Sequence, residues 1–386
     1  MRSYVILRRP KADAPGRMGL ERLQPKPPEI TVENLPDHAL PELDADPDTS
    51  YAENMPTALI EPLDSPAPAV AGADWGIAAV GADASPFTGA GVTVAVLDTG
   101  IDAAHPAFAG VTLVEKDFTG SGNGDVKGHG THCAGTIFGR DVGGQRIGIA
   151  RGVGKALIGK VLRNDGKGDS GMVFEALQWA LSEKADIVSM SLGFDFPGLV
   201  KNLTSEGWDI EPATSMALVG YRSNLRMLDT IMAMLKAHGA LGTSPLVVAA
   251  AGNESKRAAV TPYRIAASLP AAADGVIAVA AIGRDADTYK VAPFSNMLAA
   301  VAAPGVDITS AWPGGGLHTI SGTSMACPHV SGVAALWWQA LEQKGISASA
   351  ASVGARILAS ARRNVFPADV LEVDIGQGMV TAPPAN

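Results

Sequence analysis

Short apolar runs separated by amphipathic stretches fill the chain from Trp75 onward. The runs are continuous and rich in β-branched residues, which is typical of strands buried on both faces of a parallel sheet. Strands that alternate with helices favour an α/β domain, because each connecting helix covers one face of the sheet. We expect strands at residues 92–97, 156–162, 187–192, 246–251 and 276–281.

The stretches between these runs predict helices. The longest has apolar or aromatic side chains at steps of three and four, which place them on one helix face. Gly239 is suited to end it, because glycine readily adopts the left-handed conformation that follows a helix. We predict a three-layer α/β fold with a mostly parallel central sheet and helices on both faces. The predicted helices lie at residues 129–138, 172–184, 214–238 and 325–343.

Residues 1–73 have a different composition from the rest of the chain. Prolines and acidic residues are dense there, and no amphipathic helix can be drawn through them. Only residues 4–8 and 57–60 look extended. This composition favours an extended tail that is packed on the main domain or loosely attached to it. The chain is therefore divided into an N-terminal extension at 1–73, a main domain at 74–382 and a short tail at 383–386.

Composition and charge narrow the range of partners. Hydrophobic residues make up 47% of the 386 positions and aromatics 5%, and 44 glycines suit closely packed strands and helices. There are 39 acidic and 30 basic residues, and the resulting net charge of −9 argues against nucleic acid or an anionic membrane as the main partner. Two cysteines, Cys133 and Cys327, are too few for a disulfide framework, so buried free thiols are expected.

Targeting signals are not evident in the sequence. No run approaches the roughly 18 apolar residues that a membrane-spanning helix needs. The first residues are basic around a very short apolar stretch, without the longer apolar segment and the small-residue cleavage site of a secretory signal. With Met1 as the natural start, we expect a cytoplasmic protein.

Three segments carry a reactive residue at the edge of a predicted strand or helix. Asp98 ends the strand in VAVLDTG, His129 is flanked by glycines in GHGTHCAG, and Ser324 begins a helix in SGTSMACPHVSG. Taken singly, the aspartate could bind a metal or a nucleotide, and the serine could cap its helix. His129 and His132 lack a third ligand at metal spacing, which argues against zinc. Together, in the order Asp, His, Ser, the segments indicate nucleophilic catalysis.

These motifs resemble those of the subtilase family. The strings VAVLDTGID, GHGTHCAG and SGTSMACPHVSG match the family's Asp, His and Ser motifs, and AAAGNE around Asn253 matches its oxyanion motif. The similarity runs from Trp75 to Val380, roughly four-fifths of the chain. The resemblance implies a subtilisin-like fold and the activity of a serine endopeptidase.

The resemblance also implies a role for each of these residues in peptide hydrolysis. Ser324 would attack the peptide carbonyl and His129 would carry the proton. Asp98 would hold the imidazole in the right tautomer and stabilise its charged form. The Asn253 side chain and the Ser324 backbone N–H would bind the oxyanion of the tetrahedral intermediate.

Subtilases bind a peptide as an added β-strand between two edges, so backbone hydrogen bonds supply much of the affinity. The resemblance places one edge after the strand at 156–162 and the other at the end of the strand at 187–192. A third segment, after 246–251, would wall a modestly roomy apolar pocket whose floor lies within 256–268. The implied substrate-binding residues are Gly166, Lys167, Gly168, Ser191, Leu192, Gly193, Ala250, Ala251 and Gly252.

Residues 194–213 make the chain longer than a compact subtilase needs. They begin beside a predicted binding edge, so one hypothesis is that they rim the cleft and narrow the range of substrates. The alternative is a surface insertion without a role in binding, because loops on protein surfaces tolerate added residues.

No cofactor is required for this chemistry, but secreted subtilases usually bind structural calcium. The segment 139–147 has one acid and two arginines where an oxygen-rich loop is expected, which argues against a strong calcium site there. A different calcium or sodium site remains open.

The extension resembles two inhibitory devices of the family. Residues 4–7 resemble the first strand of an inhibitory prodomain, and residues 59–62 loosely resemble the segment that covers the active site of intracellular members. We therefore hypothesise that part of 1–73 occupies or borders the cleft. Two further interpretations stay open beside a general endopeptidase: a peptide-binding module without activity, and a maturation protease that acts on one partner.

Overall fold

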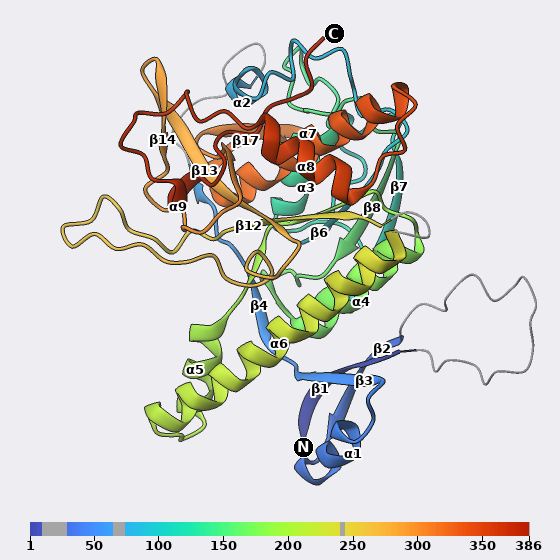
Figure 1. The fold of residues 1–386 in the computed structure, drawn as a ribbon, viewed down its shortest axis with the longest axis vertical. Coiled ribbons are helices and arrows are strands. Elements are labelled where there is room, and N and C mark those ends of the chain that lie inside the picture. The colour runs from blue at the N-terminus through green and yellow to red at the C-terminus, as the bar shows by residue number, and fades with distance from the viewer. Residues whose placement is uncertain (10–28, 65–73, 240–243, 386) are drawn as a thin grey trace, which may run out of the picture.

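The computed structural model describes residues 1–9, 29–64, 74–239 and 244–385. Figure 1 shows a large α/β body with a small β-sheet beneath it, which contains the N-terminus. An eight-stranded sheet forms the centre of the body, in the order β14-β13-β12-β10-β6-β8-β7 with β15 beside β13. Neighbouring strands are parallel except for β13 and β14. The strands are β6 (Thr93–Asp98), β7 (Thr112–Asp117), β8 (Lys155–Lys160), β10 (Ile187–Met190), β12 (Leu246–Ala250), β13 (Ile277–Asp285), β14 (Thr288–Val291) and β15 (Val301–Pro304).

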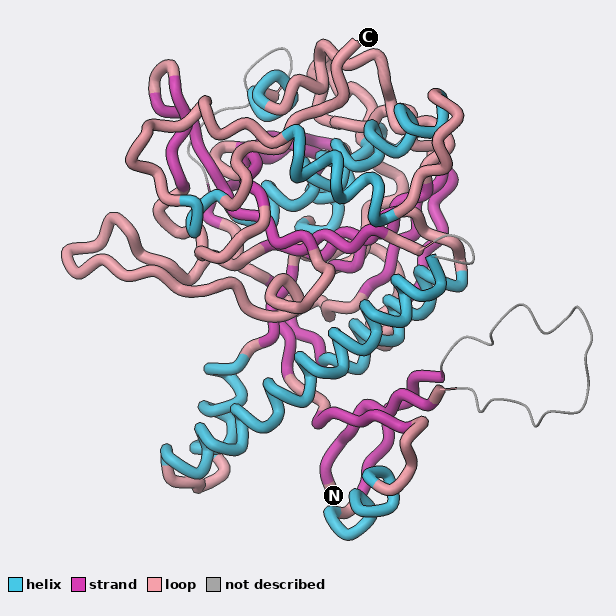
Figure 2. Tube along the Cα trace, in the orientation of Figure 1, coloured by secondary structure: helices cyan, strands magenta, loops and turns pink. Residues whose placement is uncertain are grey.

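Helices cover both faces of this sheet, because side chains alternate along its strands. In β6, Val94 and Val96 pack with α3 and α7, whereas Ala95 and Leu97 pack with α4 and α6 on the other face. Figures 1 and 2 show these two helical layers. The helices of the body are α2 (Trp75–Ala79), α3 (His129–Phe138), α4 (Ser170–Ser182), α5 (Phe196–Ser205), α6 (Ile210–Gly239), α7 (Thr323–Gln343), α8 (Ala350–Ser360) and α9 (Glu372–Ile375).

The predicted three-layer α/β fold with a mostly parallel sheet is confirmed. The helix predicted at 129–138 has those bounds, and α6 begins at Ile210 rather than at residue 214. The strand predicted at 187–192 divides in two. The chain leaves the central sheet after Met190, and β11 (Leu192–Phe194) pairs in a different, three-stranded sheet.

The described part of the N-terminal extension is folded. β1 (Arg2–Arg8) pairs antiparallel with both β2 (Glu29–Leu35) and β3 (Thr49–Glu53), and α1 (Leu40–Asp44) joins β2 to β3. This small sheet differs from the extended tail predicted for these residues. The boundary near residue 73 and the parts at 10–28, 65–73 and 386 lie outside the described residues.

The small sheet packs against α4 and α6 of the body. Val5 and Leu7 of β1 are fully buried in the same apolar cluster as those helices. The Asn224 side chain of α6 is fully buried, and its amide donates to the Glu53 carbonyl at 2.7 Å. Apolar packing and a buried hydrogen bond therefore hold the extension on the body.

Two more three-stranded sheets lie outside the central one. The first has the order β11-β4-β9 and the second the order β16-β17-β5. In each, one strand comes from the N-terminal extension and the others from the body. Their remaining strands are β4 (Pro56–Leu59), β5 (Leu63–Asp64), β9 (Lys167–Asp169), β16 (Ile308–Trp312) and β17 (Gly316–Ser321), and short 3-10 turns lie at Asp37–Ala39 and Pro106–Phe108.

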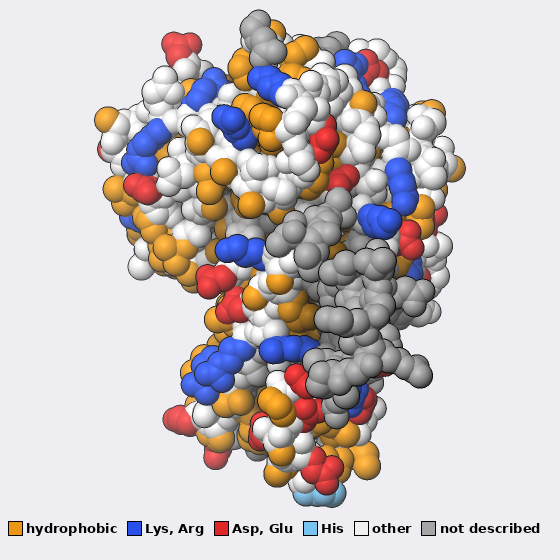
Figure 3. Space-filling model, turned by 45° about the vertical axis from the view of Figure 1, so that its right-hand side comes forward, with side chains coloured by type: hydrophobic (Ala, Val, Ile, Leu, Met, Phe, Trp, Pro, Cys, Tyr) orange, Lys and Arg blue, Asp and Glu red, His pale blue; other side chains and the backbone are white. Residues whose placement is uncertain are grey.

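Charged side chains of both signs are mixed on the face drawn in Figure 3, without a continuous basic patch. This distribution agrees with the net charge of −9 and offers no electrostatic footprint for nucleic acid on that face. In the described part of the chain, no helix has the length and apolarity to cross a membrane.

The stability of the body is expected to fall as the pH rises from about 4 to about 6. Burial raises the pKa of Asp186 from 3.8 to about 6, although its carboxylate accepts the Thr93 N–H at 2.8 Å. Between these two values the folded state binds more protons than the unfolded state, so raising the pH favours unfolding. Asp186→Asn keeps the acceptor and should gain about 2 kcal/mol at pH 7. Urea unfolding at several pH values tests this, with exposed Asp285→Asn as control.

Candidate active site

Asp98 and His129 form a buried pair at the carboxyl edge of the central sheet. Asp98 is the last residue of β6, and His129 is the first residue of α3. Asp98 Oδ1 lies 2.7 Å from His129 Nδ1 and also accepts the Thr99 N–H at 2.7 Å. The two side chains are only 1% and 2% exposed. Asp98 thus fixes the orientation of the imidazole, whose Nε2 has no hydrogen-bond partner among the described residues.

Asp125 holds the loop before α3, and the sequence analysis did not single it out. Its Oδ1 accepts the N–H groups of Lys127 and Gly128, and its Oδ2 accepts the N–H and the hydroxyl of Thr131. Gly128 has a φ of 85°, and a Cβ there would lie 2.7 Å from the Trp312 ring, so glycine is required. The available signal was an acid four residues before the histidine.

Ser324 is the second residue of α7, and Pro328 leaves its carbonyl free. Proline has no N–H with which to bond the carbonyl four residues earlier in a helix. The Ser324 carbonyl instead accepts from Ser191 Oγ at 3.2 Å and from Cys133 Sγ at 3.4 Å. Cys133 Sγ also lies 3.9 Å from His129 Nδ1. One buried thiol therefore contacts both the serine backbone and the histidine ring.

The Asn253 side chain lies at the N-terminus of α7. Its Oδ1 accepts the backbone N–H and the hydroxyl of Thr323, both at 2.9 Å. These bonds fix which way Nδ2 points, and Nδ2 donates to the Glu61 carbonyl at 3.0 Å. Unpaired N–H groups at a helix start and a fixed side-chain amide can together stabilise developing negative charge.

Burial and neighbouring charges set the protonation of the site. Burial lowers the pKa of His129, but the charge and hydrogen bond of Asp98, with the charges of Asp125 and Glu61, outweigh it and raise that pKa above 6.5. The imidazole is thus suited to accept a proton. Burial raises the pKa of the Cys133 thiol well above 9.0, so Cys133 stays protonated and is a poor nucleophile.

His132 and Cys327 have structural surroundings. His132 Nε2 lies 3.1 Å from the Ile308 carbonyl oxygen and 3.2 Å from that of His318, and burial lowers the His132 pKa to about 3. Burial raises the Cys327 pKa to about 11. Both cysteines are free and buried, as predicted.

β4 occupies the groove that the sequence analysis assigns to a peptide substrate. It is the middle strand of an antiparallel sheet, between β9 and β11. The Leu59 N–H also donates to the Gly166 carbonyl at 2.8 Å. Both predicted edges, which include Gly166, Lys167, Gly168, Leu192 and Gly193, therefore face an added strand, and that strand belongs to the chain's own extension (Figure 1).

The residues that follow β4 lie beside Ser324 and Asn253, but these two side chains contact two different backbone carbonyls. Ser324 Oγ lies 3.3 Å from the Ile60 carbonyl oxygen, whereas Asn253 Nδ2 binds the next carbonyl, that of Glu61. In acyl transfer, one carbonyl has to meet both the nucleophile and the oxyanion donor. The Ile60 carbonyl therefore lies beside the Ser324 hydroxyl but does not reach the Asn253 amide.

The predicted pocket walls lie beside Ile60, whose side chain is buried. Ile60 Cγ1 would be 3.7 Å from a Cβ at Gly193, and Ser268 Oγ would be 3.6 Å from it. Ala250 and Ala251 are buried at the end of β12, and Gly252 donates its N–H to Thr323 Oγ1 at 3.1 Å. Residues 250–252 thus connect the wall of the predicted pocket to the start of α7.

The insertion at 194–213 borders the cleft. β11 extends to Phe194, and α5 and the first turns of α6 follow it. Phe194, Phe196 and Pro197 of the insertion line a cavity that Ala58 and Ile60 also border. The insertion is therefore more than a remote surface loop.

Few potential metal ligands lie together among the described residues near the site. Their one group of three potential ligands is Asp98, His129 and Cys133, the candidate catalytic cluster itself. In the segment weighed for calcium, Asp141 pairs with Arg151 at 2.9 Å. In the same segment, the Arg146 guanidinium donates to the backbone carbonyls of Ala82, Gly148 and Ile149. Calcium binds through oxygen ligands, and these oxygens already accept from an arginine, so the segment does not fit calcium.

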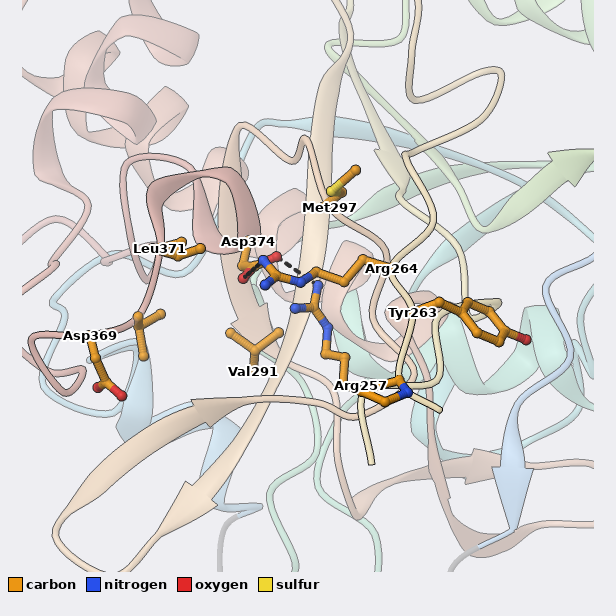
Figure 4. A pocket seen from close by; sticks show the side chains of 10 residues that line it. Arg257, Tyr263, Arg264, Val291, Met297, Asp369, Leu371 and Asp374 are labelled. Carbon is orange, nitrogen blue, oxygen red and sulfur yellow. Dashed lines mark hydrogen bonds and ion pairs between the residues drawn. The ribbon is translucent and has the colours of Figure 1, made fainter. Parts of the chain in front are cut away.

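Asp374 of α9 fixes the loop that carries the predicted pocket floor. Figure 4 shows Arg257 and Arg264 pointing toward its carboxylate. Arg257 lies 2.8 Å from one oxygen and Arg264 lies 3.1 Å from the other, and the Asp374 side chain is 8% exposed. Arg257 also donates to the Ser295 carbonyl. One acid thus holds both ends of the 257–264 loop.

Asp374→Asn is expected to lower the free energy of unfolding by about 2–3 kcal/mol, because it leaves two arginines without their shared counter-charge. Denaturant unfolding measures the loss. Glu372→Gln is the matched control, since its pair with Arg363 is exposed and 3.9 Å long. Equal stability of the two variants would contradict a special role for Asp374.

An α/β sheet with a buried Asp–His pair at its carboxyl edge, and with a serine and an asparagine at a nearby helix start, is an arrangement suited to acyl transfer. The model of the subtilase family matches residues 89–379 of the chain. The chain belongs to the subtilase family.

Named relatives agree with this assignment. The chain is 36% identical over 272 residues to Subtilisin-like protease 6 of Trichophyton soudanense and to that of Trichophyton rubrum, and 35% identical over 272 residues to that of Arthroderma gypseum. Each match covers 68% of this chain and 57% of the relative. The matched region thus spans little more than half the length of these relatives.

Proposed function

We propose that the chain is a serine endopeptidase that hydrolyses peptide bonds through an acyl-enzyme intermediate. The observation that supports this most is the buried Asp98–His129 pair at 2.7 Å. Cys133 of the same helix as His129 links this pair to Ser324, because its Sγ lies 3.4 Å from the Ser324 carbonyl oxygen. Membership of the subtilase family points the same way.

In the proposed mechanism, Ser324 Oγ attacks the carbonyl carbon and gives its proton to His129 Nε2. Asp98 stabilises the imidazolium that forms. The oxyanion is bound by Asn253 Nδ2 and the Ser324 N–H, and its collapse breaks the C–N bond as the imidazolium protonates the leaving amine. Water, activated by the same imidazole, then hydrolyses the ester. No step requires a metal or another cofactor.

We also propose that the peptide substrate binds as a strand between β9 and β11, and that the extension inhibits the enzyme by holding this place. Support comes from the pairing of β4 with both edges. It also comes from Ser324 Oγ, which lies against the Ile60 carbonyl while His129 Nε2 has no partner among the described residues. An active subtilase site needs the serine hydroxyl to meet that nitrogen, so the geometry here suits an inhibited state.

Labelling with a fluorophosphonate tests the proposed activity. The full-length chain should become covalently labelled at Ser324, slowly because the extension holds the groove, and Ser324→Ala should lose both the label and the hydrolysis of a peptide library. Ser331→Ala, which removes another hydroxyl of α7, should keep the label. If Ile60→Asp, which is expected to release the extension from the groove, stays folded but shows neither label nor cleavage, the protein is instead a peptide-binding module. Labelling together with resistance of casein to cleavage would narrow the function to a maturation protease for one partner.

A further inference from the structure

The loop before α3 carries the only Asn-Gly pair of the sequence, Asn123–Gly124. Asn123 is exposed, and among the described residues no hydrogen bond engages its side-chain amide or the backbone N–H of Gly124. Gly122 and Gly124 adopt left-handed backbone conformations, with φ of 83° and 94°. A Cβ at either glycine would meet no atom within 4 Å, so the pair lies in open space.

An asparagine that precedes a glycine is chemically reactive. The next backbone nitrogen attacks the side-chain carbonyl carbon, and glycine hinders this attack least because it has no Cβ. The new C–N bond closes an imide ring, while the side-chain nitrogen leaves as ammonia with the proton of the attacking N–H. Water then opens the ring at one of its two carbonyls. Opening at the side-chain carbonyl gives aspartate, and opening at the main-chain carbonyl gives isoaspartate, whose backbone gains a methylene group.

Gly124 is held in place on its carbonyl side. Lys160 is 2% exposed, and its Nζ donates to the Gly124 carbonyl and to Asn164 Oδ1, both at 2.8 Å. Hydrogen bonds from an ammonium group are stronger than those from neutral donors. Gly100, at the end of the central sheet, packs on the same carbonyl so closely that a Cβ would not fit. A shift of Gly124 would therefore break a buried hydrogen bond and a tight backbone contact.

The next residue, Asp125, joins the two halves of the buried Asp–His pair. Besides the contacts described above, its Oδ1 accepts from Thr99 Oγ1 at 2.8 Å, and Thr99 Oγ1 in turn accepts the Gly130 N–H at 2.9 Å. Thr99 directly follows the aspartate of the pair, and Gly130 directly follows the histidine. An added methylene lengthens the backbone by about 1.5 Å. It must therefore displace the fixed Gly124 or the carboxylate of Asp125.

We propose that Asn123 is a site of spontaneous deamidation, and that isoaspartate at this position inactivates the enzyme by displacing Asp125. Water is the co-reactant, and no oxidant or catalyst is needed. Displacement of Asp125 misaligns His129, and a misplacement of about 1 Å costs on the order of a hundredfold in rate. The modification is independent of the proposed function, whereas its effect on activity rests on that function.

Incubation of the full-length chain at pH 8.5 and 37 °C tests the site, because base removes the proton from the attacking nitrogen. Peptide mapping by mass spectrometry should show conversion of Asn123 to the acid, and an isoaspartyl methyltransferase should methylate the product. Asn164 is the internal control, since it is exposed in a loop but precedes Asp165. It should stay unmodified, as should the side chain of an Asn123→Gln variant, which would have to close a larger ring.

The rate of fluorophosphonate labelling at Ser324 tests the effect on activity. Molecules that carry isoaspartate at 123 should react at least tenfold more slowly than fresh protein. Asn123→Gln should keep its fresh rate through the same incubation. Asn123→Asp adds the charge of the product without the methylene, and an exposed charge has little effect, so its rate should stay within about twofold of wild type.

The modification site and its effect fail in different ways. An intact Asn123 in the folded chain, under conditions that modify it fully in urea, would overturn the site. Isoaspartate at 123 in molecules that label as fast as fresh protein would overturn the inactivation. Absence of labelling in fresh and incubated protein alike, with Ile60→Asp also unlabelled, would overturn the proposed function and the inactivation with it. The site itself then stands or falls on the peptide map alone.

Discussion

Asp98→Asn is expected to lower kcat for peptide hydrolysis by about ten-thousandfold with little change in fold. The Asp98 carboxylate accepts the His129 Nδ1–H at 2.7 Å and is almost completely buried. An asparagine amide can instead donate to Nδ1, which moves the imidazole proton to Nε2 and leaves no base facing the serine. The loss of charge also removes the group that raises the pKa of His129 against the effect of burial.

Single-turnover kinetics with an activated ester, together with fluorophosphonate labelling rates, measure this loss. Asp102→Asn is the matched control, because Asp102 lies in the loop that follows Asp98 and its carboxylate accepts the Ala104 and Gly314 backbone N–H groups. An Asp98→Asn chain that keeps more than a tenth of the wild-type rate would remove Asp98 from the mechanism.

Ile60→Asp should raise the activity of the full-length chain toward peptides by at least tenfold. The Ile60 side chain is 5% exposed in an apolar pocket, and burying an unpaired carboxylate there costs several kcal/mol. Glu254 lines the same cavity and adds repulsion. The strand at the nucleophile is therefore expected to leave the groove, while the small sheet stays packed on α6 through Asn224.

Two readouts check this release: kcat/KM for a short peptide and the rate of labelling at Ser324. Asn34→Asp provides the control, since it adds the same charge at an exposed position of β2. If Ile60→Asp stays folded and both rates match the wild type, the extension does not block the site.

The α/β body could be predicted because its signals are local. A β-branched run ending in Asp98, and glycines around His129, define a strand end and a helix start without reference to distant residues. The small N-terminal sheet could not be predicted in the same way. In β2 the side chains are mostly polar or half-exposed, so its assignment as a strand depends on pairing with β1.

Contacts between segments that are distant in the sequence could not be predicted either. The motif around Asn253 indicated an oxyanion donor, but not that its amide would bind the Glu61 carbonyl while Ser324 meets that of Ile60. This offset depends on where the groove directs the extension, and no residue type encodes it. The role of Pro328 was equally hidden, because it follows from a carbonyl one helical turn away.

β4 and the groove that holds it belong to one chain. A tethered segment meets its site at an effective concentration that dilution does not change, on the order of millimolar for short flexible tethers. While the chain is intact, its latency should thus be independent of protein concentration. A cut after Ile60 would turn the same segment into a separate molecule, governed by an ordinary dissociation constant. A freshly cut sample is then expected to gain specific activity on dilution.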